Sequence, residues 1–206
     1  LPLSSFIDME KGADPIAYLA GSPKRDVIFA TTDGMGLVAS LGDLATRLKA
    51  GRSFVKVADG QKLLRVIPIG PRATKLACLS ESGRLLIFGV DEIRRLASGG
   101  KGVTLMQLEP GESLLDAVAV DDRGVVVKGT GRGGKPREAL VSRRSFAEHT
   151  LRRARKGRAL DVSWKPERLE ALTDEAAGSG AAGASGAAKA SGLVLEVVDD
   201  NAPTLL

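Results

Sequence analysis

The feature that most constrains the fold of this 206-residue chain is an internal repeat of about 49 residues. When residues 27–57 are aligned with residues 76–106, Gly34 falls on Gly83 and the surrounding apolar runs coincide. A third copy begins at GVVVKGTGRGGKPREAL, and the N-terminal SSFIDMEKGADPIAYL matches half a copy. Repeats of this length stack on their neighbours and bury a continuous core, so the chain should form an array of similar units.

Each unit reads as β-structure, because short runs of Val, Ile, Leu and Phe alternate with Asp-Gly, Ser-Gly or Gly-Gly turns. In the first full copy we expect strands near 27–31, 36–40, 53–57 and 63–68. A helical turn or an irregular excursion should separate the second strand from the third. Four strands in 40–50 residues are typical of propeller-like arrays. The predicted fold is all-β, and three full copies can form an open arc as well as a closed ring.

The repeats divide the chain into a β-array over residues 1–172 and a different C-terminal region. Within the array we expect a half repeat and three full repeats, at 1–24, about 25–73, 74–122 and 123–172. Residues 173–192 are rich in Ala, Gly and Ser, which predicts a flexible linker because so little apolar surface cannot offset the entropy of ordering. The acidic segment 193–206 alternates like a short strand; disorder and docking on a sheet edge are both open for it.

The stretch KGTGRGGKP (128–136) nearly spells a nucleotide-binding loop, with Gly129, Gly134 and Lys135 at the spacing Gly-x-x-x-x-Gly-Lys. Such a loop needs Ser or Thr after the lysine and a helix that starts there. This chain has Pro136 instead, which offers neither a hydroxyl nor an N–H, and an apolar strand pattern follows. In the repeat, the stretch occupies the place of the turns TTDGMG and SESGRL. We therefore expect a β-hairpin that does not bind ATP.

Charge is distributed unevenly along the chain. Residues 1–172 hold 29 Lys and Arg against 20 Asp and Glu, whereas residues 173–206 hold five acids and one lysine. A basic body favours a polyanionic partner, and an acidic tail can compete with that partner. Ordinary solvated surface gives similar counts, so the positions of the charges have to decide.

Basic residues recur at one position of the repeat, the junction before the third strand. The three junctions are RLKAGRS (47–53), RRLASGGKG (94–102) and RRARKGR (152–158). Glycine lets a backbone approach another molecule closely, and basic side chains neutralise phosphates. The predicted DNA-contacting residues are Arg47, Lys49, Arg52, Arg94, Arg95, Lys101, Arg152, Arg153, Arg155, Lys156 and Arg158. Because no aromatic residues interleave and no recognition helix is present, we expect salt-sensitive backbone contacts with duplex DNA that tolerate or produce bending.

No other group of reactive side chains stands out. One cysteine, Cys78, and one histidine, His149, cannot build a Cys/His metal cage, and we expect His149 at the surface. Tyr18 reads as a core residue. We therefore expect no catalytic residue, no metal site and no cofactor in this chain. The lone cysteine, the absence of an apolar run long enough to span a bilayer and an N-terminus that soon turns polar favour a cytoplasmic protein without membrane span or signal peptide.

The repeats and the stretch LASGGKG resemble the C-terminal β-pinwheel domains of bacterial type IIA topoisomerase A subunits. Gyrase members of that family carry a Gln-Arg-Arg-Gly-Gly-Lys-Gly box. The residues of the box that are kept here are Gly99, Gly100, Lys101 and Gly102. Leu-Ala-Ser replaces Gln-Arg-Arg, and this degenerate box, together with GVTLMQL and RARKGRALDVSWKP, favours the topoisomerase IV branch over the gyrase branch.

The resemblance covers about residues 1–172 and implies properties that composition does not show. The full enzyme is an ATP-dependent isomerase that uses Mg²⁺ to pass one duplex through a transient break in another. Its cleaving tyrosine and the ATP site of its B subunit would lie outside this chain. This domain would be non-catalytic, bind and bend the transported duplex, and tune decatenation and relaxation in the bacterial cytoplasm at the nucleoid. A gyrase-type wrapping domain and a propeller-like module for an acidic protein are the alternatives.

Overall fold

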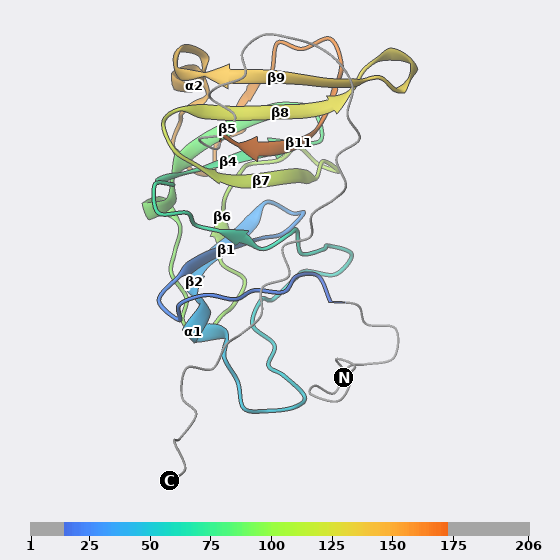
Figure 1. The fold of residues 1–206 in the computed structure, drawn as a ribbon. Helices are drawn as coiled ribbons and strands as arrows, with labels where there is room; N and C mark the ends of the chain where they lie inside the picture. Colours follow the sequence, from blue (N-terminus) through green and yellow to red (C-terminus); the bar gives the residue numbers. More distant parts are fainter. Residues whose placement is uncertain (1–14, 173–206) are drawn as a thin grey trace.

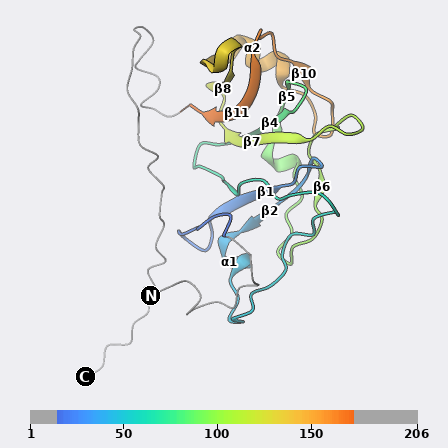
Figure 2. The same cartoon turned by 90° about the vertical axis from the view of Figure 1, so that its right-hand side faces the viewer.

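The computed structural model describes residues 15–172, which form three antiparallel β-sheets that follow one another along the molecule (Figures 1 and 2). The predicted all-β class is therefore confirmed. Within the described residues no helix is long and apolar enough to cross a membrane. The segments predicted as the start of the half repeat, the linker and the acidic tail lie in 1–14 and 173–206, outside the described residues.

Each sheet is built around the hairpin of one repeat unit. The first sheet has the order β3 (Ile67–Pro68), β1 (Asp26–Ala30), β2 (Met35–Ser40) and β6 (Val103–Thr104). The second sheet has the order β10 (Arg158–Ala159), β5 (Arg84–Gly89), β4 (Lys75–Ser80) and β7 (Leu114–Val120). The third sheet has the order β11 (Lys165–Ala171), β8 (Gly124–Thr130) and β9 (Pro136–Ser142).

The three hairpins are equivalent in register. Ala30 faces Gly36, Leu79 faces Leu85, and Thr130 faces Pro136 at the residue pair next to each turn. Each turn contains a glycine with a positive φ close to 75°, a conformation that glycine adopts without steric cost; these glycines are Gly34, Gly83 and Gly134. The hairpin predicted for KGTGRGGKP is confirmed, because Pro136 opens strand β9 and not a helix.

A short helical segment follows the second strand of each unit, as the sequence pattern predicts. These segments are α1 (Leu41–Leu44), the 3-10 turn η2 (Val90–Glu92) and α2 (Arg143–His149); another 3-10 turn, η3 (Arg132–Gly134), lies within the third hairpin. A capping box starts α1: Asp43 N–H donates to Ser40 Oγ at 3.3 Å, and Ser40 N–H donates to Asp43 Oδ2 at 2.9 Å.

The strands of one unit are shared between two sheets, which the repeat alignment did not predict. β6 belongs to the second unit but pairs with β2 of the first, and β10 belongs to the third unit but pairs with β5 of the second. The predicted strand at 53–57 is wrong: only Val55 forms a bridge there, to Gly100. Its place in the repeat is that of β6 and β10, whose pairing partner is the second strand of the preceding unit.

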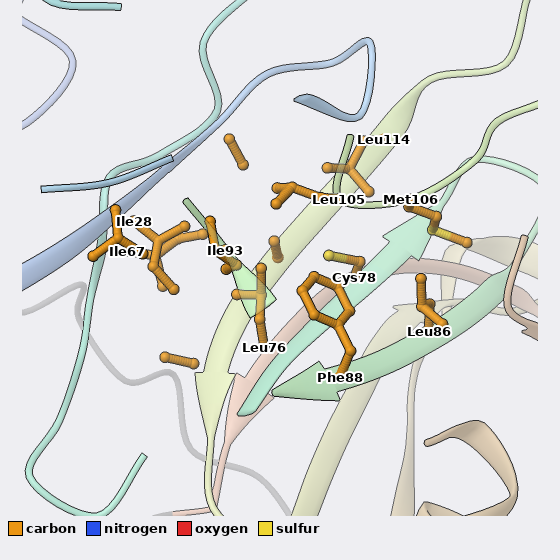
Figure 3. Packing of buried hydrophobic residues seen from close by; sticks show 14 residues of the cluster. Ile28, Ile67, Leu76, Cys78, Leu86, Phe88, Ile93, Leu105, Met106 and Leu114 are labelled. Atoms are coloured by element: carbon orange, nitrogen blue, oxygen red, sulfur yellow. The ribbon is translucent and has the colours of Figure 1, made fainter. Parts of the chain in front are cut away.

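Mainly aliphatic side chains fill the space between the sheets. The largest cluster lies between the first and second sheets and includes Ile28, Leu76, Phe88 and Leu105, all fully buried (Figure 3). A second cluster joins the second and third sheets, with Trp164 packed against it. Removing this apolar surface from water is the dominant favourable term in the stability of the array.

Two placements predicted from the sequence are wrong. Tyr18 is 55% exposed and is not a core residue. His149 is only 8% exposed, because it shares one face of α2 with the buried Phe146 three residues earlier, and that helix packs on β5. Its position at the last turn of the helix gave no sign of this burial.

Candidate nucleic-acid interface

The second and third junctions directly precede the outer strands β6 and β10, and the residues that follow the first junction contact the second junction. The second junction packs on the residues that follow the first: Gly100 N–H donates to the carbonyl of Phe54 at 2.8 Å, and Lys56 N–H donates to the carbonyl of Gly100 at 3.0 Å. The third junction packs on the residues after β6 in the same way, through Ala154 N–H to Leu105 O and Gln107 N–H to Arg155 O. The junctions therefore form one continuous series.

The glycines of the second and third junctions are required by this packing. Gly102 and Gly157 both have positive φ, 81° and 70°, directly before β6 and β10. A Cβ at Gly157 would lie 2.7 Å from the carbonyl oxygen of Leu85, and one at Gly102 would overlap the carbonyl oxygen of Gly36. These glycines let the outer strand approach the neighbouring strand of its sheet, whereas Gly51 of the first junction has no such neighbour within 4 Å.

Four of the eleven predicted DNA-contacting residues are held by partners within the fold. Arg95 pairs with Asp26, with 2.7 Å between Nη1 and Oδ1, and Lys156 pairs with Glu109 at 2.6 Å. Arg153 donates from its guanidinium to Thr104 O, and Arg52 donates to Asp43 O while its guanidinium lies 5.1 Å from the centre of the Phe54 ring. These side chains stabilise the junctions.

The remaining seven are exposed and form no side-chain hydrogen bond or ion pair within residues 15–172. They are Arg47, Lys49, Arg94, Lys101, Arg152, Arg155 and Arg158. Each junction contributes at least two of them. The structure therefore presents solvated, uncompensated positive charge along the whole series of junctions, which is the charge distribution that a polyanion requires.

Among the carboxylates close to this series, that of Asp43 stays charged. The pKa of Asp43 is lowered, first by the hydrogen bond from the Ser40 N–H and then by the Ser40 hydroxyl, and the charges of Arg95 and Arg52 lower it further. The Asp26 carboxylate in turn raises the pKa of Arg95. Ion pairs such as Arg95–Asp26 hold the junctions in place, and the other basic side chains remain exposed to the solvent.

A second group of basic residues, which the repeat pattern did not predict, lies at the opposite edge of the sheets. Arg25, Arg65, Arg72 and Arg123 surround a hollow beside β3 and β7. No repeat position carries a basic residue of this group in all three copies, so three-fold recurrence could not select them. Within the described residues, no group of three or more His, Cys, Asp or Glu side chains is placed to hold a metal ion.

A family model described as "DNA gyrase C-terminal domain, beta-propeller" matches residues 25–69 and 74–121. The A subunit of DNA topoisomerase 4 from Neisseria gonorrhoeae is 30% identical over 175 residues, which are 82% of this chain and 22% of that protein. The corresponding protein of Escherichia coli K12 is 25% identical over 112 residues, 54% of this chain and 15% of that protein. The chain thus spans about a fifth or less of the length of these relatives.

Solved structures show the same fold. The E. coli ParC C-terminal domain has a TM-score of 0.71 at 20% identity, covering 82% of this chain and 69% of that one. A DNA gyrase A C-terminal domain has a TM-score of 0.61 at 16% identity, covering 84% and 58%. The resemblance of the chain to this kind of domain is thereby confirmed.

Proposed function

Because this chain belongs to the C-terminal β-pinwheel domains of the type IIA topoisomerase A subunits, we propose that it binds and bends duplex DNA along its three basic junctions. The observation that carries the proposal is the continuous series of junctions, each with at least two exposed basic side chains that have no partner within residues 15–172. Phosphate contacts of this kind position a duplex without reading its sequence.

The same arrangement of junctions would bend a bound duplex. Backbone hydrogen bonds join the second and third junctions to the residues that follow the preceding junction, so the spacing of the junctions is set by the packing of the sheets. A duplex that contacts more than one of them has to follow their path, and the added phosphate contacts repay the energy of deformation. The duplex would be the segment transported by the full enzyme.

The finer role follows the topoisomerase IV branch. In this proposal the domain is non-catalytic and tunes decatenation and relaxation by the full ATP- and Mg²⁺-dependent isomerase. The rest of the A subunit would supply the cleaving tyrosine, and the B subunit would bind ATP. The similarity to topoisomerase 4 A subunits and the degenerate box, in which Leu-Ala-Ser precedes Gly99, support this branch. We place it in the bacterial cytoplasm, at the nucleoid.

A gyrase-type wrapping domain is the second candidate, because a gyrase A C-terminal domain shares the fold over 84% of this chain. Wrapping would require a long site and would constrain supercoils, whereas a domain that presents one bent segment would protect a shorter length of DNA. Footprint length on a linear duplex therefore separates the two. A module that binds an acidic protein through the same charges is the third candidate.

The test is the affinity for a duplex of about 40 base pairs across a salt series. The variant Lys49→Ala/Lys101→Ala/Arg155→Ala removes one exposed, unpaired charge from each junction and avoids the ion-paired Lys156 and Arg52. We expect the slope of log K against log[salt] to become shallower by up to about three phosphate contacts.

The matched control is Lys24→Ala/Lys62→Ala/Lys135→Ala, which removes the same charge outside the junctions. It should leave the slope close to that of the wild type. If both triple variants lose affinity equally, the binding is diffuse and the junctions are not the site. If the wild type does not bind the duplex, the acidic-protein candidate takes precedence.

A further inference from the structure

The third sheet has one strand fewer than the other two, and the open position lies beside β9 (Figure 1). In the first two sheets, a strand of the next unit covers the second strand of the hairpin: β6 covers β2, and β10 covers β5. The equivalent strand of the third hairpin is β9, which pairs only with β8 within residues 15–172. Its outer edge can therefore accept one more strand.

The main-chain groups of Glu138 and Leu140 point to this open edge. Gly131 N–H donates to the carbonyl of Lys135 at 2.8 Å, so the backbone of Lys135 faces β8. Successive residues of an antiparallel strand direct their backbone groups to opposite sides, which turns those of residues 138 and 140 away from β8. Within the part of the chain that the structure describes, no backbone hydrogen bond reaches Glu138 or Leu140 from that side.

The equivalent groups of the first hairpin are paired. Val38 takes the place of Glu138 in the register of the hairpins. Its N–H donates to the carbonyl of Arg94 at 3.1 Å, and its carbonyl accepts from the N–H of Leu96 at 2.9 Å. Both partners belong to the next unit, so the fold covers this position wherever a next unit follows.

The edge of β9 has a protected half and an open half. Pro136, Arg137 and Glu138 form the first half, and proline and charged residues on an edge discourage pairing with other chains. Residues 139–142 carry no charge, and Leu140 among them is 55% exposed. A strand that pairs with this second half would gain main-chain hydrogen bonds and remove apolar surface from water.

We propose that the outer edge of β9 is the docking site of the acidic segment of this same chain, residues 193–200 (LVLEVVDD), which adds to the third sheet as its fourth strand. Five of these eight residues are Leu or Val, and β-branched residues such as Val are favoured in strands. Leu193, Leu195 and Val197 would lie on one face of the added strand, since side chains alternate along a strand.

The path of the chain favours this edge. Ala171, at the end of β11, pairs with Val125, and the neighbouring Gly124 pairs with Ser142 at the end of β9. Only β8 separates β11 from β9, so the chain leaves the sheet about two strand spacings, or about 10 Å, from the end of β9. Residues 173–192, rich in Ala, Gly and Ser, have a root-mean-square end-to-end distance of about 25 Å, enough to reach the edge.

The direction of the added strand also brings opposite charges together. β6 and β10 are antiparallel to the strands that they cover, and an antiparallel segment would begin beside Ser142 and end beside Arg137. That direction starts the segment where the linker arrives and places Asp199 and Asp200 near Arg137, which is exposed. Cross-strand pairs of opposite charge stabilise a sheet.

The tether makes a modest affinity sufficient. A short flexible linker gives an effective concentration on the order of 1 mM, so a segment with an intrinsic Kd of about 0.1 mM would be docked in about nine chains of ten. Docking at β9 leaves the three junctions open. The inference therefore does not depend on the proposed DNA binding.

The test is amide hydrogen exchange in the full chain, followed by NMR without DNA. We expect the amides of Glu138 and Leu140 to exchange about tenfold more slowly than in the variant Glu196→Pro/Val197→Pro. Two adjacent prolines remove one N–H from each side of the added strand, so the pairing is lost in either register. The amide of Val141 faces β8 and should exchange equally in both proteins, which shows that the sheet is intact.

The matched control is Ala181→Pro/Ala182→Pro, which places the same two prolines in the linker and should keep the slow exchange at Glu138 and Leu140. Equal exchange in the wild type and Glu196→Pro/Val197→Pro would overturn the proposal, and so would equal effects of the two double variants. Slow exchange that is lost on dilution would show that a second copy covers the edge, which also overturns it. Because DNA is absent, none of these results bears on the DNA-binding test.

Discussion

The guanidinium of Arg65 donates two hydrogen bonds of 3.1 Å to the carboxylate of Asp116, from Nε to Oδ1 and from Nη2 to Oδ2. Asp116 lies on β7 and is 8% exposed at its side chain. Its Oδ2 also accepts the N–H of Leu169 on β11 at 2.7 Å, and Arg65 donates to the carbonyl of Leu169 at 3.0 Å. One ion pair therefore joins the segment before β3 to the second and third sheets.

Asp116→Ala should be among the most destabilising single changes in the array. It leaves the Leu169 N–H without its acceptor and Arg65 without its counter-charge. The expected loss is about 3 kcal/mol in the free energy of unfolding, the low end for a broken buried pair because Arg65 is 41% exposed. Urea unfolding measures it. Asp122→Ala breaks the exposed pair with Lys75 and should cost less than about 1 kcal/mol; equal losses would contradict a special role for Asp116.

Ala154→Gly should stabilise the protein. Ala154 is the one non-glycine residue with a positive φ, 61°, within residues 15–172, and Gly99 takes the same conformation at the equivalent place of the second junction. Relief of the left-handed strain outweighs the entropy of glycine, for a net gain of about 0.5–1 kcal/mol. Thermal melting would show the gain. The control Ala147→Gly, in α2, should lose about 1 kcal/mol, and a loss of that size at Ala154 would refute the strain argument.

His149 should make the protein less stable as the pH falls. Burial lowers the pKa of its imidazole below the ordinary value of 6.5, and Arg158 lowers it further, against opposing effects of the Leu85 carbonyl and Glu148. The unfolded chain then binds the proton more readily than the folded one. The stabilising contribution is complete above about pH 6.5 and is lost as the pH drops through the folded pKa. Between pH 7 and 5, the free energy of unfolding should fall less steeply with pH for His149→Leu than for the wild type. Equal slopes for the two proteins would exclude the effect.

Cys78 should resist alkylation in the folded protein. Its side chain is fully buried, and burial, followed by the charge of Asp116, raises the pKa of its thiol far above the ordinary range. The thiolate is the reactive form, so iodoacetamide at pH 8 should modify the native chain at least about a hundredfold more slowly than the chain in urea. Mass spectrometry follows the reaction, and comparable rates in both conditions would show that the second sheet opens readily.

Much of the fold could be predicted from the repeat, since alternating apolar runs and Gly-containing turns placed the strands of the first hairpin within a residue and located the other two hairpins by alignment. The exchange of outer strands could not be predicted. A two-residue strand such as β6 is too short to show an alternating apolar pattern, and its pairing depends on a strand of another repeat unit. The burial of His149 depends in the same way on how α2 packs against β5.

The candidate site was predicted only as a set of charges. Recurrence along the sequence identified the three junctions, but it could not separate the exposed Lys101 from Lys156, whose partner Glu109 is distant in sequence. Nor could it identify Arg65 and Asp116, because each occurs once and their bond spans 51 residues. Interactions between residues that do not recur in the repeat cannot be predicted from the repeat pattern.

The exchange of outer strands also bears on how such arrays grow. A newly duplicated unit would bring the strand that covers the edge of its predecessor and would leave only its own edge exposed. Within the described residues that last edge is β9, and it begins with Pro136 at the position held by Gly36 and Leu85 in the other two hairpins. Proline has no N–H to offer a further strand. A further strand paired beside β9 would therefore lack the backbone donor that a non-proline residue provides at this position.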